Sequence, residues 1–139
     1  MIKALLDTNV LIDYIVPYRP GSECARRIIE AAGSSRFEAI VSAGSLKDVY
    51  YLVRKHASDE VARACLSALM DLAEVAAVDR TACALALKSS EPDFEDGIVR
   101  VLAETGGADF IVTRDKTAFA DSTCHAVEPL LFADAVCRP

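Results

Sequence analysis

The sequence has little of the positive charge on which proteins that coat nucleic acids rely. Its 139 residues include 15 Lys and Arg against 21 Asp and Glu, which gives a formal net charge of -6. Non-specific binding along nucleic acid depends on clustered cationic side chains that release phosphate counterions. We therefore expect any nucleic-acid contact of this chain to be local.

Zinc ligands are also scarce. The sequence holds two histidines and five cysteines, and no two cysteines are spaced as Cys-x-x-Cys. An odd number of widely spaced cysteines favours small apolar residues in a reducing cytosol over a disulfide or zinc framework. The cysteines, which we expect to be mostly buried, are Cys24, Cys65, Cys83, Cys124 and Cys137.

Long uncharged apolar stretches are missing as well. The apolar run after Lys3 is interrupted by Asp7, and no segment reaches the roughly 18 residues that a membrane span requires. The sequence also lacks internal repeats, linkers and low-complexity stretches. With 53% apolar residues, the chain has enough for a conventional core. We expect one domain over residues 1–139, located in the cytoplasm and without a membrane association.

What the sequence does contain is a regular alternation of short apolar runs and segments of helical periodicity. Strands are predicted at 2–7, 37–42, 74–78, 108–113 and 125–127. Helices are predicted at 8–16, 20–33, 45–55, 58–72, 80–88, 93–105 and 129–137. Such alternation predicts an α/β protein with three layers, α/β/α, in which a central, mostly parallel sheet of four to five strands has helices on both faces.

Four aspartates stand where this fold would bring them together. Asp7 and Asp115 follow predicted strands, and open parallel sheets bind ligands outside the carboxyl ends of their strands. Asp48 lies inside a predicted helix, and Asp96 lies one turn into the helix that Asp93 is predicted to cap. Carboxylates about 5 Å apart repel by roughly 3 kcal/mol per pair at a dielectric of about 20, so such a cluster needs a counter-charge. Ligation by oxygen alone favours Mg²⁺ or Mn²⁺, and such ions commonly promote hydrolysis of phosphodiesters.

Each of these aspartates also has an ordinary interpretation as a helix cap, a solvated helix residue or a turn residue. Short polar neighbours of the first and last aspartate would orient the carboxylates or a metal-bound water, or serve in capping and turn formation. These supporting residues are Thr8, Asn9 and Thr113. Arg114, beside Asp115, is the candidate for a phosphate contact.

Other residues near these segments receive structural interpretations. Tyr50 and Tyr51, at helical spacing beside Val49, are expected in a core or a subunit interface. Asp13 and Glu95 lie close in sequence to the aspartates and either could join them, but a solvated helix face explains both, so they are left out of the predicted site.

Four fragments, in this order, resemble the PIN domain (PilT N-terminal domain) family of metal-dependent ribonucleases, especially the small VapC-like toxins of bacterial toxin-antitoxin pairs. They are 5–11 (LLDTNVL), 45–51 (SLKDVYY), 93–96 (DFED) and 111–116 (IVTRDK). The resemblance spans nearly the whole chain. It implies a catalytic acidic quartet that binds Mg²⁺ or Mn²⁺, formed by Asp7, Asp48, Asp96 and Asp115, with Thr8, Asn9 and Thr113 alongside. It also implies an RNA substrate, a homodimer and an antitoxin segment laid across a groove.

Two positions depart from the family pattern. Asp48 stands where Glu is frequent and is one methylene shorter, so we expect it to reach a metal through water. Gly97 stands where Ala is common. Glycine costs about 1 kcal/mol of helix propensity relative to alanine, which would loosen the turn that carries Asp96.

Three other functions deserve comparison with this interpretation. A phosphatase of the haloacid dehalogenase type needs a second acid two residues after the first, where this chain has Asn9. A phosphorylated receiver domain needs an acid pair near the first strand, which Asp7 lacks. The alternative that stays open is a non-catalytic PIN-fold module that binds RNA or another protein.

Overall fold

The centre of the protein is a parallel β-sheet. The structure is a computed structural model that describes residues 1–137, and its sheet has five strands in the order β3-β2-β1-β4-β5, each parallel to its neighbour. The strands are β1 (Lys3–Leu6), β2 (Glu38–Ser42), β3 (Ala73–Ala76), β4 (Phe110–Val112) and β5 (His125–Val127). The helices are α1 (Thr8–Ile15), α2 (Ser22–Gly33), α3 (Ala43–His56), α4 (Asp59–Leu72), α5 (Arg80–Lys88), α6 (Phe94–Thr105) and α7 (Pro129–Val136).

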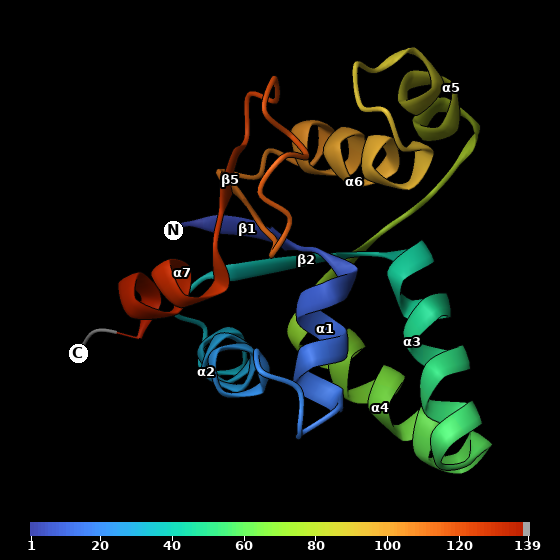
Figure 1. Cartoon of the computed structure of the whole chain (residues 1–139), viewed down its shortest axis with the longest axis vertical. Helices are drawn as coiled ribbons and strands as arrows, with labels where there is room; N and C mark the ends of the chain where they lie inside the picture. The colour runs from blue at the N-terminus through green and yellow to red at the C-terminus, as the bar shows by residue number, and fades with distance from the viewer. Residues whose placement is uncertain (138–139) are drawn as a thin grey trace.

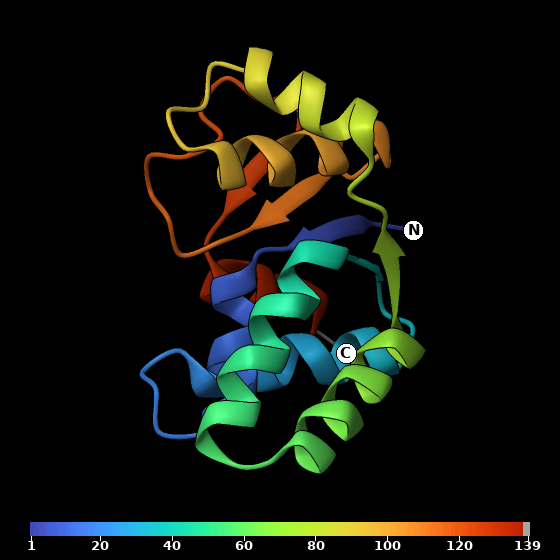
Figure 2. The same ribbon diagram turned by 90° about the vertical axis from the view of Figure 1, so that its right-hand side faces the viewer.

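Helices cover both faces of the sheet. In Figure 1, α5 and α6 lie above the strands, and α1, α2, α3, α4 and α7 lie below them. Figure 2, turned by 90°, shows the same division. The predicted three-layer α/β/α fold with a parallel central sheet is therefore confirmed.

The strands alternate their side chains between two hydrophobic cores, as the period of two in a β-strand requires. Leu5, Ile40 and Ile111 pack into the core beneath α5 and α6. Ala4, Leu6 and Val112 pack into the core on the opposite face. Because both faces of the three central strands are buried, β1, β2 and β4 consist mostly of consecutive apolar residues and do not alternate apolar with polar ones.

Short polar side chains begin several helices. The Ser42 hydroxyl accepts a hydrogen bond from Gly44 N at 3.1 Å, so α3 begins two residues earlier than the predicted residue 45. The predicted cap at Ser58 is confirmed, because its hydroxyl accepts from Val61 N at 3.1 Å. Capping of this kind satisfies amide groups that have no partner within the helix.

Gly97 lies where α6 packs closely against the end of α5. A Cβ atom at this position would lie 3.0 Å from the carbonyl oxygen of Ala86 and 3.0 Å from Oγ of Ser89. The residue is buried within a continuous α6, and the expected loosening of this turn stays a prediction. Glycine here allows the two helices to pack together.

The expectation that most cysteines are buried is wrong. All five cysteines are free thiols, but only Cys124 is buried and the other four are partly exposed. Tyr50 packs partly against the core, as expected, whereas Tyr51 is 59% exposed and lies outside the core, so its place in a subunit interface stays a prediction. Among residues 1–137, no helix combines the length and the apolar character needed to cross a membrane.

Candidate active site

The candidate site lies where the strand order of the sheet reverses. From β1 the chain proceeds to β2 and β3 on one side, and it later adds β4 and β5 on the other side of β1. Open α/β sheets bind ligands at the carboxyl ends of strands beside such a switch point. Asp7 directly follows β1, and Thr113 directly follows β4.

Asp7 is buried and receives hydrogen bonds on both carboxylate oxygens. Its side chain is 8% exposed, Oδ1 accepts from Thr8 N at 2.8 Å, and Oδ2 accepts from Thr113 Oγ1 at 2.8 Å and from Asn9 Nδ2 at 3.4 Å. Burial raises the pKa of Asp7 above its ordinary value, although the bonds from Thr113 and Thr8 oppose this shift. The three predicted supporting residues therefore hold the first aspartate.

Asp115 is exposed and opens a turn after β4. Its Oδ1 accepts from Thr117 N at 2.8 Å, Thr117 Oγ1 at 3.1 Å and Ala118 N at 3.0 Å. These bonds lower the pKa of Asp115. All three use the same oxygen, so Oδ2 is available for a further ligand within the described part of the chain.

Asp48 is partly buried on α3, beside the start of α1. The hydroxyls of Thr8 and Ser45 are 2.6 Å apart and join these two helices. A hydrogen bond with Asp48 is also the main cause that raises the pKa of Glu95 on α6.

Asp96 lies in the first turn of α6. The predicted cap is confirmed, because Asp93 Oδ1 accepts from Glu95 N at 2.7 Å and from Asp96 N at 3.3 Å. The pKa of Asp96 is raised to about 6, first by burial and then by the negative charges of Asp7, Asp93 and Asp115. The site therefore carries more negative charge than its own side chains balance.

The four predicted aspartates line one pocket of about 510 Å³. We call it the acidic pocket. Its other lining residues are Thr8, Asn9, Ile12, Arg19, Glu95 and Val99. Elements that are far apart in the sequence thus bring Asp7, Asp48, Asp96 and Asp115 together.

Three residues at or beside this pocket were not among the predicted site residues. Asp13 is 2% exposed, so its interpretation as a solvated residue is wrong, and its position three residues after buried Val10 was the available signal. Glu95 lines the pocket although it is exposed. Arg19 lies between α1 and α2, where no periodic pattern marks it.

Arg114 is held by Asp13. Its Nε lies 2.7 Å from Asp13 Oδ2, and its side chain is 45% exposed. Its backbone amide donates to Asn9 Oδ1 at 3.3 Å. The predicted contact of Arg114 with a phosphate stays a prediction.

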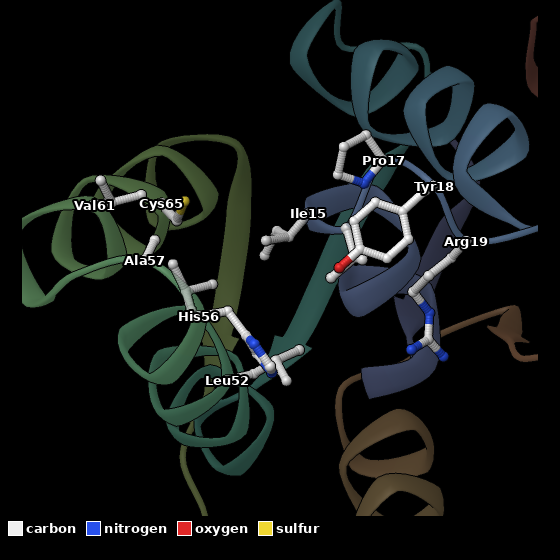
Figure 3. A pocket seen from close by; sticks show the side chains of 11 residues that line it. Ile15, Pro17, Tyr18, Arg19, Leu52, His56, Ala57, Val61 and Cys65 are labelled. Atoms are coloured by element: carbon white, nitrogen blue, oxygen red, sulfur yellow. The ribbon is translucent and has the colours of Figure 1, made fainter.

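A second, apolar pocket of about 380 Å³ adjoins the acidic one at Arg19, which lines both. It lies between the end of α1 and the α3-α4 hairpin, and Figure 3 shows the guanidinium group of Arg19 directed away from it. We call it the apolar pocket. Among its lining residues are Ile15, Pro17, Tyr18, Leu52, Val61 and Cys65.

The donor chemistry of the acidic pocket suits a hard divalent cation, since carboxylate oxygens are the ligands that Mg²⁺ and Mn²⁺ prefer. The carboxylates are not already arranged to coordinate a metal ion. In residues 1–137, no group of three or more His, Cys, Asp or Glu side chains is arranged so that it could hold a metal ion. Metal binding at this pocket would therefore require the carboxylates to move closer together.

Comparison with known families gives one match over most of the chain. A protein-family model described as "PIN domain" matches residues 3–117. A search of curated proteins finds no significant match.

Several solved structures share the fold. A toxin-antitoxin complex from Klebsiella pneumoniae is 20% identical with a TM-score of 0.69, covering 91% of this chain and 97% of that one. DNA-bound VapBC from Salmonella typhimurium is 21% identical with a TM-score of 0.67, covering 93% and 99%. VapC20 from Mycobacterium tuberculosis, described as a toxin that cleaves the sarcin-ricin loop, is 16% identical with a TM-score of 0.66, covering 82% and 91%.

Proposed function

Because the chain belongs to the PIN domain family, we propose that it is a ribonuclease that hydrolyses RNA phosphodiester bonds with the help of Mg²⁺ or Mn²⁺. One observation carries this proposal. Four aspartates, which lie directly after β1, on α3, on α6 and in the turn after β4, line a single pocket at the switch point of the sheet. Their mutual repulsion gives such a grouping little value for stability alone.

In this proposal Asp7, Asp48, Asp96 and Asp115 hold the metal and form the catalytic group. When bound, a divalent ion would lower the pKa of an attacking water and neutralise charge on the phosphoryl oxygens. The pKa of Asp96 is raised to about 6 by burial and by the nearby carboxylates. This supports the proposal that the acidic pocket needs a cation to balance its negative charge.

The surrounding residues would keep the carboxylates in place. Asp7 is oriented by Thr8 N and by the Thr113 hydroxyl. The amide of Asp115 is held by Thr113 Oγ1 at 3.0 Å. Asp48 lines the acidic pocket beside Glu95, and a water-mediated contact with the metal would suit this short acid.

We also propose that the protein acts as the toxin of a toxin-antitoxin pair in the cytoplasm. Structures of the same fold include toxin-antitoxin complexes, and free thiols at all five cysteines suit a reducing compartment. The apolar pocket, which adjoins the acidic pocket at Arg19, would receive a segment of the antitoxin. A homodimer, which family resemblance implies, is tested by light scattering of the purified protein.

The deciding experiment measures cleavage of labelled single-stranded RNA by the purified protein. We expect cleavage with Mg²⁺ or Mn²⁺, none with EDTA, and none by Asp7→Asn or Asp96→Asn, each of which keeps its circular dichroism spectrum. Asp71→Asn is the matched control, because Asp71 is exposed on α4 and does not line the acidic pocket. Cleavage that persists unchanged in excess EDTA would falsify the mechanism.

A non-catalytic PIN-fold module that binds RNA or a protein is the second candidate. It is favoured by the absence of a ready-made metal cage in residues 1–137. If calorimetry detects no Mg²⁺ or Mn²⁺ binding and no RNA is cut, while Asp96→Asn is more stable than the parent protein, this second function replaces the first.

A further inference from the structure

Asp13 is a buried carboxylate with an arginine on each side. Its side chain is 3% exposed, Oδ1 lies 2.8 Å from Nε of Arg19, and Oδ2 lies 2.7 Å from Nε of Arg114. Arg19 comes from the segment between α1 and α2, and Arg114 comes from the turn after β4. One carboxylate therefore joins two segments that are far apart in the sequence.

Stability alone is a weak reason for this arrangement. Burying a carboxylate requires the loss of its hydration, and apolar residues of similar size stabilise a protein at least as well as a buried ion pair. Two arginines also exceed what one carboxylate needs, which leaves a net positive charge beside a pocket lined by five acidic residues.

Both arginines keep their terminal nitrogens available. Each uses Nε to bind Asp13, and within residues 1–137 no other hydrogen bond or ion pair occupies either guanidinium group. Their side chains are 39% and 45% exposed. A guanidinium group bound through Nε still offers paired N–H donors that match the geometry of a phosphate.

Arg19 lines the acidic pocket, and Arg114 lies beside it. Arg19 shares the lining with Asp7 and Asp115, and Figure 3 shows its guanidinium directed away from the apolar pocket. The backbone amide of Arg114 donates to Oδ1 of Asn9, which also lines the pocket, at 3.3 Å. Because Asp13 binds both guanidinium groups, a strand that passes Arg19 in the pocket would have Arg114 next to it.

We propose that Asp13 is a positioning residue that holds Arg19 and Arg114 as a clamp for a backbone phosphate of the RNA strand at the acidic pocket. This inference rests on the proposed function for the identity of the strand. It adds two phosphate contacts to the acidic quartet, and it gives the contact between the exposed Arg114 and the buried Asp13 a function.

The first test measures binding of a fluorescein-labelled single-stranded RNA in EDTA, by anisotropy over a series of KCl concentrations. We expect Arg19→Gln and Arg114→Gln each to weaken binding about tenfold. Each should also reduce the slope of log Kd against log salt concentration by about 0.7, the value for one phosphate contact on a single strand. Arg19→Lys should keep the slope and lose affinity, because an ammonium group lacks the second set of donors.

Arg26→Gln is the matched control for these variants. Arg26 is 51% exposed, is paired with Glu23 and Glu30, and does not line the acidic pocket. If Arg19→Gln and Arg114→Gln match Arg26→Gln in both affinity and slope, the clamp does not exist. A lower melting temperature without a change in slope would assign these arginines a structural role only and would equally reject the clamp.

The second test separates positioning from charge. Asp13→Asn removes a negative charge, so electrostatics alone would tighten RNA binding, whereas loss of positioning weakens it. Gly21→Ala changes no charge, but its Cβ would lie 2.2 Å from Oδ2 of Asp13 and displace it. We expect both variants to weaken binding at least threefold, and tighter binding by Asp13→Asn together with unchanged binding by Gly21→Ala overturns the inference.

Failure of the clamp and failure of the proposed function give different results. If RNA is cut with Mg²⁺ but the arginine variants behave as Arg26→Gln does, the inference fails and the ribonuclease stands. If no RNA is cut under any condition but the salt slope depends on Arg19 and Arg114, the clamp stands in a protein that only binds RNA.

Discussion

The hydroxyl of Thr113 donates a 2.8 Å hydrogen bond to Oδ2 of Asp7, which joins the ends of β4 and β1 across 106 residues of sequence. The same hydroxyl oxygen accepts from the amide of Asp115 at 3.0 Å. One buried side chain therefore connects two of the four aspartates that line the acidic pocket.

Replacement of this hydroxyl tests its importance. Thr113→Val keeps the shape of the side chain but leaves a buried carboxylate without one of its donors, which should lower the free energy of unfolding by about 1–3 kcal/mol. It should also raise the pKa of Asp7 further, because the bond from Thr113 now lowers that pKa. Urea denaturation measures the first effect, and Thr113→Ser, which retains the hydroxyl, should recover most of the loss. Equal stabilities for the Val and Ser variants would contradict this role.

The raised pKa of Asp96 predicts how stability depends on pH. A carboxyl whose pKa rises from 3.8 to about 6 on folding binds its proton more tightly in the folded protein. Its ionisation therefore destabilises the fold, an effect that is absent below the unfolded pKa, grows as pH rises, and is complete above the folded pKa. In EDTA, Asp96→Asn should raise the free energy of unfolding by about 1 kcal/mol at about pH 8, after allowance for partial solvent exposure, and by much less near pH 4.

Urea denaturation of the parent protein and of Asp96→Asn at each pH measures the two free energies of unfolding and tests this prediction. The difference between them isolates Asp96 from the other acids that titrate in the same range. A variant that is less stable than the parent at the higher pH, or a difference that does not change with pH, would show that ionisation of Asp96 does not destabilise the folded protein.

Metal binding should stabilise the folded protein. A ligand at about 100 times its Kd adds about 2.7 kcal/mol to the free energy of unfolding, so Mg²⁺ should raise the melting temperature of the parent protein. The increase should disappear in Asp7→Asn and persist in Asp71→Asn. It should also weaken as pH falls through the pKa of Asp96, about 6, because a protonated carboxyl binds metal poorly. Thermal denaturation with and without EDTA is the measurement, and an identical Mg²⁺ response in all three proteins would remove Asp7 from the metal site.

The close packing of α5 and α6 predicts an effect opposite to helix propensity. Alanine normally stabilises a helix by about 1 kcal/mol relative to glycine, yet a Cβ at Gly97 would lie 3.0 Å from the carbonyl oxygen of Ala86. Gly97→Ala should therefore lower the free energy of unfolding by about 1–2 kcal/mol, as expected for overpacking. Gly33→Ala is the control, because nothing lies within 4 Å of a Cβ there, and this change should be neutral or stabilising.

Local features were predictable from the sequence. The caps at Ser58 and Asp93 depend on residues within one turn of the chain, so short-range pattern was enough to find them. Parallel strands that are buried on both faces are continuous apolar runs, which made the α/β alternation visible. The edge of the sheet that holds Asp7 and Asp115 follows from the same alternation.

Features that depend on packing between distant segments were not predictable. The spacing of Asp13 from Val10 indicates the buried side of α1, but only the approach of Arg19 and Arg114 makes burial of a carboxylate there possible. The role of Gly97 likewise requires α5 as a neighbour.

By itself, then, the sequence determined the order of strands and helices and the positions of Asp7, Asp48, Asp96 and Asp115, since periodicity and capping act over a few residues. Only the tertiary structure decided which other charges join them. Glu95 reaches Asp48, and Arg19 reaches the acidic pocket, through contacts between elements that are far apart along the chain. Those contacts are set by how the helices pack against the sheet, and no spacing in the sequence encodes the distance between two side chains on different elements.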